Sequence, residues 1–241
     1  MKIDLNCDMG EGIGSDVDIM PYITSANIAC GFHAGDAVTM RETVRLAKRY
    51  GVAVGVHPGW RDREGFGRRE MSLPAEEVEA LVREQVQALA EIARAEGVTL
   101  RHVKPHGALY NQAAREQELA NAIARAVKAV GGELILVGLA GCGLVEAGVA
   151  AGLNVANEGF PDRNYNPDGT LVSRKEPHAI IESPEEVAAH ALELARYGVT
   201  FGGRRVRVET LCLHGDHPRA AENARRVREA LAAAGIEVRA L

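Results

Sequence analysis

The chain has 241 residues, of which 46% are hydrophobic and 25% charged, and its formal net charge at pH 7 is −5. These values suit one α/β domain spanning residues 1–241, and the lack of a basic block argues against nucleic acid as a partner. No apolar run approaches the ~20 residues that a membrane span needs. The four cysteines show no CxxC spacing and the N-terminus lacks a signal-peptide core, so we expect reduced thiols and a cytoplasmic protein.

Short apolar runs alternate with amphipathic segments along the chain. Strands are predicted at residues 2–8, 25–30, 52–58, 100–106, 133–140, 153–159 and 209–216, with a short apolar segment at 236–241. Helices are predicted at residues 36–51, 72–97, 114–131, 183–198 and 216–235, from capping residues and C-terminal glycines. Repeated strand–helix units indicate a mostly parallel sheet with helices outside.

Each strand alternates between an apolar side and a small or polar side. In the first strand, Ile3 and Leu5 share one side while Asn6 and Asp8 share the other. In the fifth strand the small residues Gly138 and Ala140 are assigned to the second side. A doubly wound open sheet, which remains the alternative, would give near-continuous apolar runs. A closed barrel with a narrow interior explains the asymmetry better, and the strand count predicts a distorted, seven-stranded TIM-like (β/α) barrel.

Ionisable and amide side chains gather at the C-terminal ends of the predicted strands. They are Asn6, Asp8, His33, His57, Lys104, His106, Glu158, His214 and Asp216. Any one of them alone has a structural explanation. Together they are costly to bury unless they pair, bind metal or serve chemistry. We therefore predict a shared active site at the barrel mouth.

The long segment from Gly159 to Ser183 has no predicted helix or strand, which is typical of a lid or binding loop. Its candidates for holding an anionic substrate are Asp162, Arg163, Tyr165 and Arg174, because a guanidinium fork suits a carboxylate or phosphate. The sequence contains no GxxxxGK[ST] phosphate loop and no GxSxG nucleophile elbow.

Six ordered motifs carry a resemblance to a known family. They are DLNCDMGEG (Asp4–Gly12), SANIACGFHAGD (Ser25–Asp36), HPG…GFGRR (His57–Arg69), VKPHGALYN (Val103–Asn111), DRNY…DGTLVSR (Asp162–Arg174) and HGD (His214–Asp216). With these motifs the chain resembles the LamB/YcsF family, whose members are the A subunit of prokaryotic 5-oxoprolinase.

The resemblance implies a barrel of the glycoside hydrolase/deacetylase type. It also implies ATP-dependent hydrolytic opening of 5-oxo-L-proline (pyroglutamate) to L-glutamate, carried out together with B and C subunits. ATP with Mg²⁺ is the implied cofactor; whether this chain, its partners or both together bind it stays open, as does self-association. A lactam carbonyl is a poor electrophile, and phosphorylation of its oxygen would let water attack the ring.

If the reaction is ATP-dependent opening of the lactam, the residues at the barrel mouth can be given roles. Asp8 or Glu158 is a candidate general base, and His57, His106 or His214 would protonate the leaving nitrogen. Lys104, with Arg163 nearby, would hold the phosphate or the substrate carboxylate. Substrate binding is assigned to Asn6, Asn27, His33, Asp162, Arg163, Tyr165, Arg174 and Asp216.

Three rival interpretations remain at this point. The first is a metal-dependent amidohydrolase or deacetylase, in which Asp8 with His33, His57 or His106 binds a divalent ion. The second is an aldolase that uses Lys104 as a Schiff-base nucleophile. The third is a non-catalytic subunit that only presents substrate to its partners.

Overall fold

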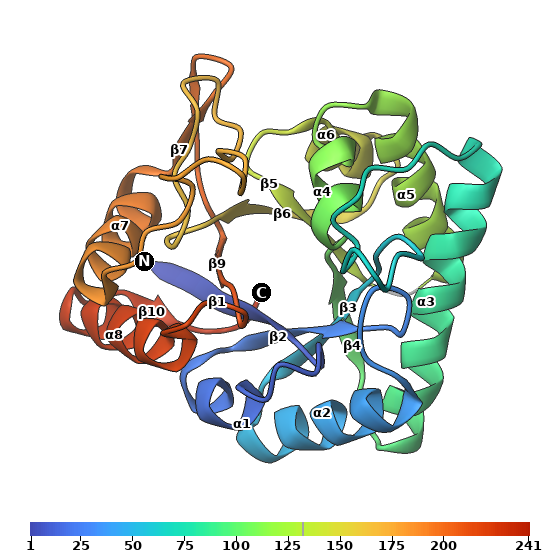
Figure 1. Cartoon of the computed structure of the whole chain (residues 1–241), viewed down its shortest axis with the longest axis horizontal. Helices are drawn as coiled ribbons and strands as arrows, with labels where there is room; N and C mark the ends of the chain where they lie inside the picture. Colours follow the sequence, from blue (N-terminus) through green and yellow to red (C-terminus); the bar gives the residue numbers. More distant parts are fainter. Residues whose placement is uncertain (132) are drawn as a thin grey trace.

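A closed parallel barrel forms the centre of the computed structural model, which describes residues 1–131 and 133–241 (Figure 1). Within these residues the barrel strands are β1 (Lys2–Met9), β2 (Ser25–Ala29), β3 (Ala53–His57), β4 (Leu100–Val103), β5 (Ile135–Leu139), β6 (Asn154–Gly159) and β9 (Thr210–Leu213). Each strand pairs with the next in this order, and β9 pairs with β1 to close the ring. The predicted seven-stranded barrel is confirmed, and the open sheet is excluded.

Helices surround the barrel, as Figure 1 shows. The long ones are α2 (Ala37–Tyr50), α3 (Ala75–Ala95), α5 (Gln117–Val130), α7 (Pro184–Tyr197) and α8 (Ala220–Ala233). Two predicted N-caps form, because the side chain of Asp36 accepts a hydrogen bond from the Thr39 amide and that of Ser183 from the Glu186 amide. In the described residues, no helix combines the length and apolarity needed to cross a bilayer.

Several short elements lie outside the predicted set. They are α1 (Asp16–Ile19), the 3₁₀ helix η1 (Met20–Tyr22), α4 (Gly107–Ala113), α6 (Gly143–Ala150), the hairpin of β7 (Val199–Phe201) and β8 (Arg204–Val206), and β10 (Glu237–Val238) beside β1. The helix predicted from residue 114 begins at Gln117, because α4 occupies the preceding turn. The helix predicted from residue 216 begins at Ala220, because Asp216 instead pairs with arginines at the barrel mouth.

The barrel interior is lined with polar side chains that hydrogen-bond to one another. Asn27 donates to Asn6 Oδ1 at 2.7 Å and to Asp8 Oδ1 at 2.8 Å, and its own Oδ1 lies 2.6 Å from His102 Nε2. Gly55 makes room for that ring, since a Cβ there would lie 2.1 Å from His102 Nε2. The interior therefore holds its polar side chains in fixed positions below the mouth.

The structure corrects the prediction of which side of the fifth strand faces the barrel interior. Ile135 is paired with the inward-facing His102, and Leu139 is paired with Glu158, so the odd-numbered residues of β5 face the interior. Gly138 instead packs toward α6, where a Cβ would lie 3.1 Å from Val145. Because both faces of β5 are apolar or small, its composition does not distinguish them.

Candidate active site

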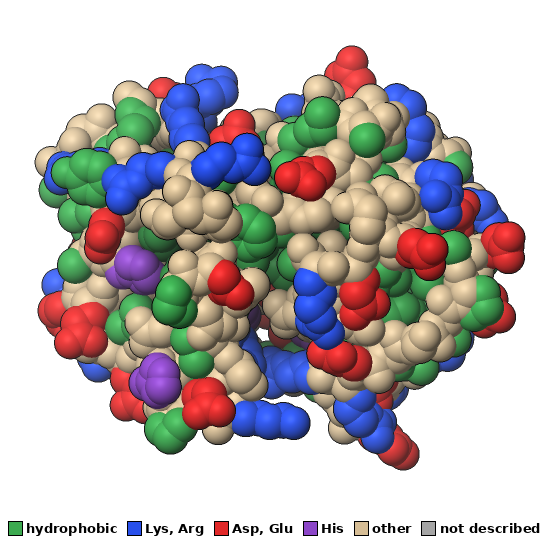
Figure 2. Space-filling view, turned by 90° about the horizontal axis from the view of Figure 1, so that it is seen from above, with side chains coloured by type: hydrophobic (Ala, Val, Ile, Leu, Met, Phe, Trp, Pro, Cys, Tyr) green, Lys and Arg blue, Asp and Glu red, His purple; other side chains and the backbone are tan. Residues whose placement is uncertain are grey.

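A pocket of about 940 Å³ lies at the C-terminal ends of the barrel strands. Its walls come from strand ends, from α4 and from the segment that follows β6, including residues 168 and 170–175. In the space-filling view, the molecule is hollowed near the middle of the face shown, with Lys or Arg and acidic side chains beside the hollow (Figure 2). The predicted catalytic residues that line the pocket are Asp8, His57, Lys104, His106 and His214.

Lys104 carries a buried positive charge at the centre of this site. Its side chain is 3% exposed, and Nζ lies 2.9 Å from Asp8 Oδ1, 3.1 Å from Glu158 Oε1 and 2.9 Å from Cys212 Sγ. Burial alone would favour the neutral amine, but the attraction of Asp8 and the other neighbours outweighs it and raises the pKa of Lys104 well above its usual value. A lysine held as an ammonium is not a nucleophile, which argues against the aldolase interpretation.

The two carboxylates beside Lys104 have different environments. Glu158 is fully buried and accepts from Tyr110 Oη at 2.7 Å and Asn6 Nδ2 at 2.9 Å, behind the pocket wall. Asp8 reaches the pocket surface. Burial opposes its charge, but the nearby His57 and Lys104 more than compensate and hold the pKa of Asp8 well below its usual value. Asp8 is therefore the carboxylate that stays charged and is open to the pocket.

His214 is oriented by a buried aspartate. Asp162 accepts from the His214 backbone amide at 2.9 Å, and its carboxylate lies 2.9 Å from His214 Nδ1. Burial disfavours the carboxylate, but His214 and these hydrogen bonds overcome it and lower the pKa of Asp162 to about 2. With Nδ1 held by Asp162, Nε2 of His214 is available on the pocket side.

The depressed pKa of Asp162 predicts a pH-dependent contribution to stability. The shift from 3.8 to about 2 corresponds to about 2 kcal/mol. This contribution is fully present above about pH 4 and is lost as the pH falls toward about 2. We expect Asp162→Asn to be less stable than the native chain at neutral pH, with a gap that narrows on acidification. Urea unfolding at several pH values measures this gap, and a gap that stays constant down to the lowest pH at which both chains fold would contradict the assignment.

A second cluster joins the loop after β1 to three histidines. Glu11 Oε1 lies 3.5 Å from His33 Nε2 and 3.3 Å from His106 Nδ1, and the latter atom is 3.0 Å from His57 Nε2. The rings of His33 and His106 stack with centroids 3.8 Å apart. Nitrogen and oxygen atoms of these four residues lie close enough together to share a metal ion, as do the ligand atoms of a second group, Asp8, Cys212 and His214.

Several predicted substrate-binding residues lie behind the pocket wall. Those that line the pocket are Arg163, Arg174 and Asp216; those that do not are Asn6, Asn27, His33, Asp162 and Tyr165. Arg163 donates from Nε and Nη2 to the carbonyl oxygens of Ala179 and Val172, so its guanidinium ties together the segment after β6. The Tyr165 hydroxyl accepts from the Phe160 amide at 2.6 Å and so also holds this segment.

Ion pairs cross the pocket mouth. Asp216 pairs with Arg68, from the loop after β3, and with Arg174 Nη1 at 3.3 Å. Arg68 was not among the predicted site residues, although it lies in the motif that starts at His57. Tyr110, Cys212 and Glu11 were also missed as site residues. The signal for Tyr110 is its place on the first turns of α4, directly after the rim residue His106.

Comparison with known proteins gives the family. A model of the LamB/YcsF family matches residues 3–241. The chain belongs to the LamB/YcsF family. It is 54% identical to a protein of Symbiobacterium thermophilum named as the A subunit of 5-oxoprolinase, with 98% of this chain and 94% of that protein covered.

Solved structures agree with this membership. The crystal structure of a lactam utilization protein from Thermus thermophilus superposes with a TM-score of 0.92, at 50% identity and with 100% of both chains covered. A family 4 carbohydrate esterase from Streptomyces lividans gives a TM-score of 0.51 at 13% identity, covering 98% of this chain and 91% of that one. The second likeness shows that this LamB/YcsF barrel shares its fold with deacetylase-type barrels.

Proposed function

We propose that this chain is the A subunit of an ATP-hydrolysing 5-oxoprolinase, which opens 5-oxo-L-proline to L-glutamate together with B and C subunits. The observation that carries the proposal is the similarity, over 98% of the chain, to a protein named as the A subunit of 5-oxoprolinase. ATP dependence implies that the complex works in the cytoplasm, where ATP is available. The chain then acts as a hydrolase on a cyclic amide.

The pocket suits a small anionic lactam. Its lining includes Arg68, Lys104 and Arg174, which provide positive charge for the carboxylate of 5-oxoproline. A volume of about 940 Å³ exceeds what an amino-acid-sized ring needs. The pocket therefore has room for a phosphorylated substrate or for a segment of a partner subunit.

Different residues at the strand ends can carry out the separate steps of ring opening. Asp8, held charged on the pocket surface, takes a proton from the attacking water. His214, oriented by Asp162, gives a proton to the ring nitrogen as the C–N bond breaks. The opened product is γ-glutamyl phosphate, and a second water molecule hydrolyses it to glutamate and inorganic phosphate. Lys104 stabilises negative charge that develops on the lactam carbon's oxygens. His57 and His106 are less suited to moving that proton. One ring nitrogen of each lies against a backbone carbonyl, and their other ring nitrogens face each other at 3.0 Å.

ATP supplies the activation of the lactam carbonyl oxygen. Because the sequence lacks a GxxxxGK[ST] loop, we assign ATP and Mg²⁺ to the partner subunits. Activation and hydrolysis would then be divided between the subunits, with this chain receiving the activated ring.

Removing Arg174 should weaken substrate binding more than it slows turnover. Arg174→Ala deletes one charged hydrogen-bond donor, so KM for 5-oxoproline is expected to rise about 10–100-fold while kcat changes little. Arg225→Ala is the matched control, because Arg225 lies on the outer helix α8 and pairs there with Glu229. An unchanged KM in Arg174→Ala would show that the substrate carboxylate binds elsewhere.

An omission experiment tests the proposed function. The chain is purified with B and C subunits from the same organism, and glutamate release from 5-oxoproline is measured with ATP. We expect release only when all three subunits and ATP are present. Full activity from B and C without this chain, or ATP-independent activity from this chain alone on 5-oxoproline, would overturn the proposal.

A further inference from the structure

We propose that Glu11, His33, His57 and His106 bind one divalent transition-metal ion of the Zn²⁺ class at the edge of the pocket. The inference rests on side-chain geometry and does not depend on the proposed reaction. Imidazole and carboxylate ligands suit Zn²⁺ and the neighbouring first-row ions.

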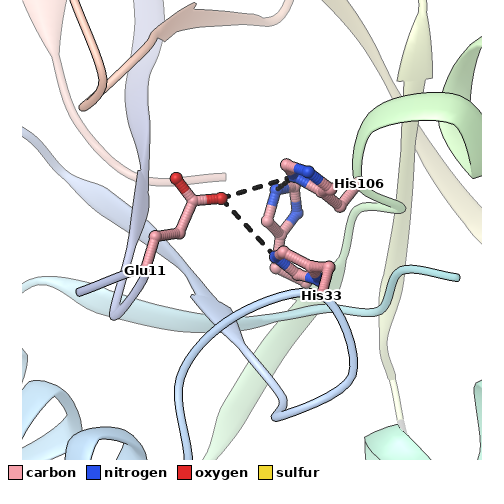
Figure 3. Close-up of side chains that lie close together, drawn as sticks. Glu11, His33 and His106 are labelled. Carbon is pink, nitrogen blue, oxygen red and sulfur yellow. Dashed lines mark hydrogen bonds and ion pairs between the residues drawn. The ribbon is translucent and has the colours of Figure 1, made fainter. Parts of the chain in front are cut away.

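Three separations between the ligand atoms fit such an ion, and all four atoms lie within 4.8 Å of one another. Two ligands on a tetrahedral centre with bonds of about 2.0–2.1 Å lie about 3.3 Å apart. The separations in the structure are 3.0 Å for His57 Nε2 to His106 Nδ1, 3.3 Å for His106 Nδ1 to Glu11 Oε1, and 3.5 Å for Glu11 Oε1 to His33 Nε2. Figure 3 shows the Glu11 carboxylate directed at His33 and His106.

The hydrogen-bond partners of His57 and His106 determine which ring nitrogen of each carries the hydrogen. His57 Nδ1 lies 2.7 Å from the Lys104 carbonyl oxygen, and His106 Nε2 lies 2.9 Å from the Phe66 carbonyl oxygen. A carbonyl only accepts, so these nitrogens carry the hydrogens. In the neutral rings the other nitrogens, 3.0 Å apart, carry lone pairs, and His57 Nε2 also lies 3.3 Å from Asp8 Oδ2. A cation can bind both lone pairs, and a ring that donates its far N–H to a backbone carbonyl is the usual arrangement of a metal-bound histidine.

Unsatisfied buried atoms point to the same place. Glu11 Oε1 and both ring nitrogens of His33 are buried without a hydrogen-bond partner among the described residues, and His33 is 1% exposed. Such atoms are costly to bury unless an ion or another partner binds them.

The second candidate group provides a contrast. Asp8 and Cys212 lie 2.9 Å from Lys104 Nζ, so an ammonium already occupies the position that an ion would take between them. In the cluster around Glu11 no comparable lysine contact is present among the described residues. The structure therefore favours one metal site over the other.

The backbone also supports the histidine rings closely. A Cβ at residue 59 would lie 2.5 Å from His33 Nδ1, and one at residue 67 would lie 2.9 Å from His106 Cδ2. Glycine at these positions lets two loop segments pack directly on the rings and fix their orientation. Because Glu11, His57 and His106 line the pocket, an ion bound here would face it.

Metal analysis tests the site without using activity. The purified chain is stripped with a chelator, supplied with Zn²⁺ or Co²⁺, freed of excess ion by gel filtration and analysed by elemental mass spectrometry. We expect about one ion per chain, and a Co²⁺ absorption spectrum of a four-coordinate site. Removing a group that only orients a metal ligand costs about 10–100-fold in metal affinity. Glu11→Gln and His33→Ala each remove a direct ligand, so each should lower the affinity for the ion by more than that.

His178→Ala serves as the control, because His178 is exposed on the segment after β6 and lies outside the cluster. Far-UV circular dichroism shows whether each variant is folded, and Glu11→Gln keeps the size of the side chain if His33→Ala fails to fold. Two results would overturn the proposal: no retained ion in the native chain, or variants of Glu11 and His33 that bind the ion as tightly as His178→Ala does.

Discussion

Replacing Lys104 with methionine is expected to lower ATP-dependent glutamate release by about 10²–10³-fold. Methionine keeps much of the side-chain length but removes the charge that lies within 3.1 Å of both Asp8 and Glu158. Without the ammonium, the pocket loses its buried positive charge, and two carboxylates remain beside each other. Turnover by the complete three-subunit enzyme measures the effect, and near-native turnover would eliminate the assigned role.

The same substitution is expected to destabilise the fold. Breaking a buried ion pair by removing one partner costs about 3–5 kcal/mol, because the remaining charge stays buried. Urea unfolding of Lys104→Met measures this loss, and turnover has to be compared at a temperature where the variant is folded. Asp4→Asn is a suitable control: Asp4 is a buried acid bonded to Thr210 and Ser25, but it does not line the pocket. It should lose stability and keep the turnover of the folded enzyme.

Asp8→Asn is expected to reduce kcat by about 10²–10⁴-fold with little change in KM. Asparagine preserves the shape of the side chain and can still contact Asn27 and Lys104, but it cannot accept a proton from water. Asp168→Asn is the matched control, because Asp168 is an exposed acid at the edge of the same pocket. A similar loss in both variants, or no loss in Asp8→Asn, would show that Asp8 is not the base.

The barrel and much of its interior could be predicted because strand residues alternate. Asn6, Asp8 and Lys104 lie on one side of their strands, and the closed sheet brings them together in the interior. The fifth strand was assigned the wrong side for a physical reason: it is apolar or small on both faces, so alternation gives no signal. Its pairing with Glu158 determines the side, and pairing is not visible in a single sequence.

The residues whose roles could not be assigned from sequence patterns lie in loops. Glu11 lies in a glycine-rich turn, where no periodicity relates a side chain to a direction, and only the folded turn aims it at His33. Arg163 was expected to hold an anion, but its donors contact backbone carbonyls of its own segment. An arginine in a long segment can bind substrate or organise the segment, and composition alone does not distinguish these roles.

Ring opening by the isolated chain tests the central claim most directly, namely that this pocket performs the hydrolysis and does not merely present the substrate. A cyclic O-alkyl imidate of 5-oxoproline carries an already activated C5 and removes the need for ATP and the other subunits. We predict that the chain alone accelerates its opening to the γ-ester of glutamate, and that Asp8→Asn does not. No acceleration over the uncatalysed reaction, with a folded chain, would contradict this account.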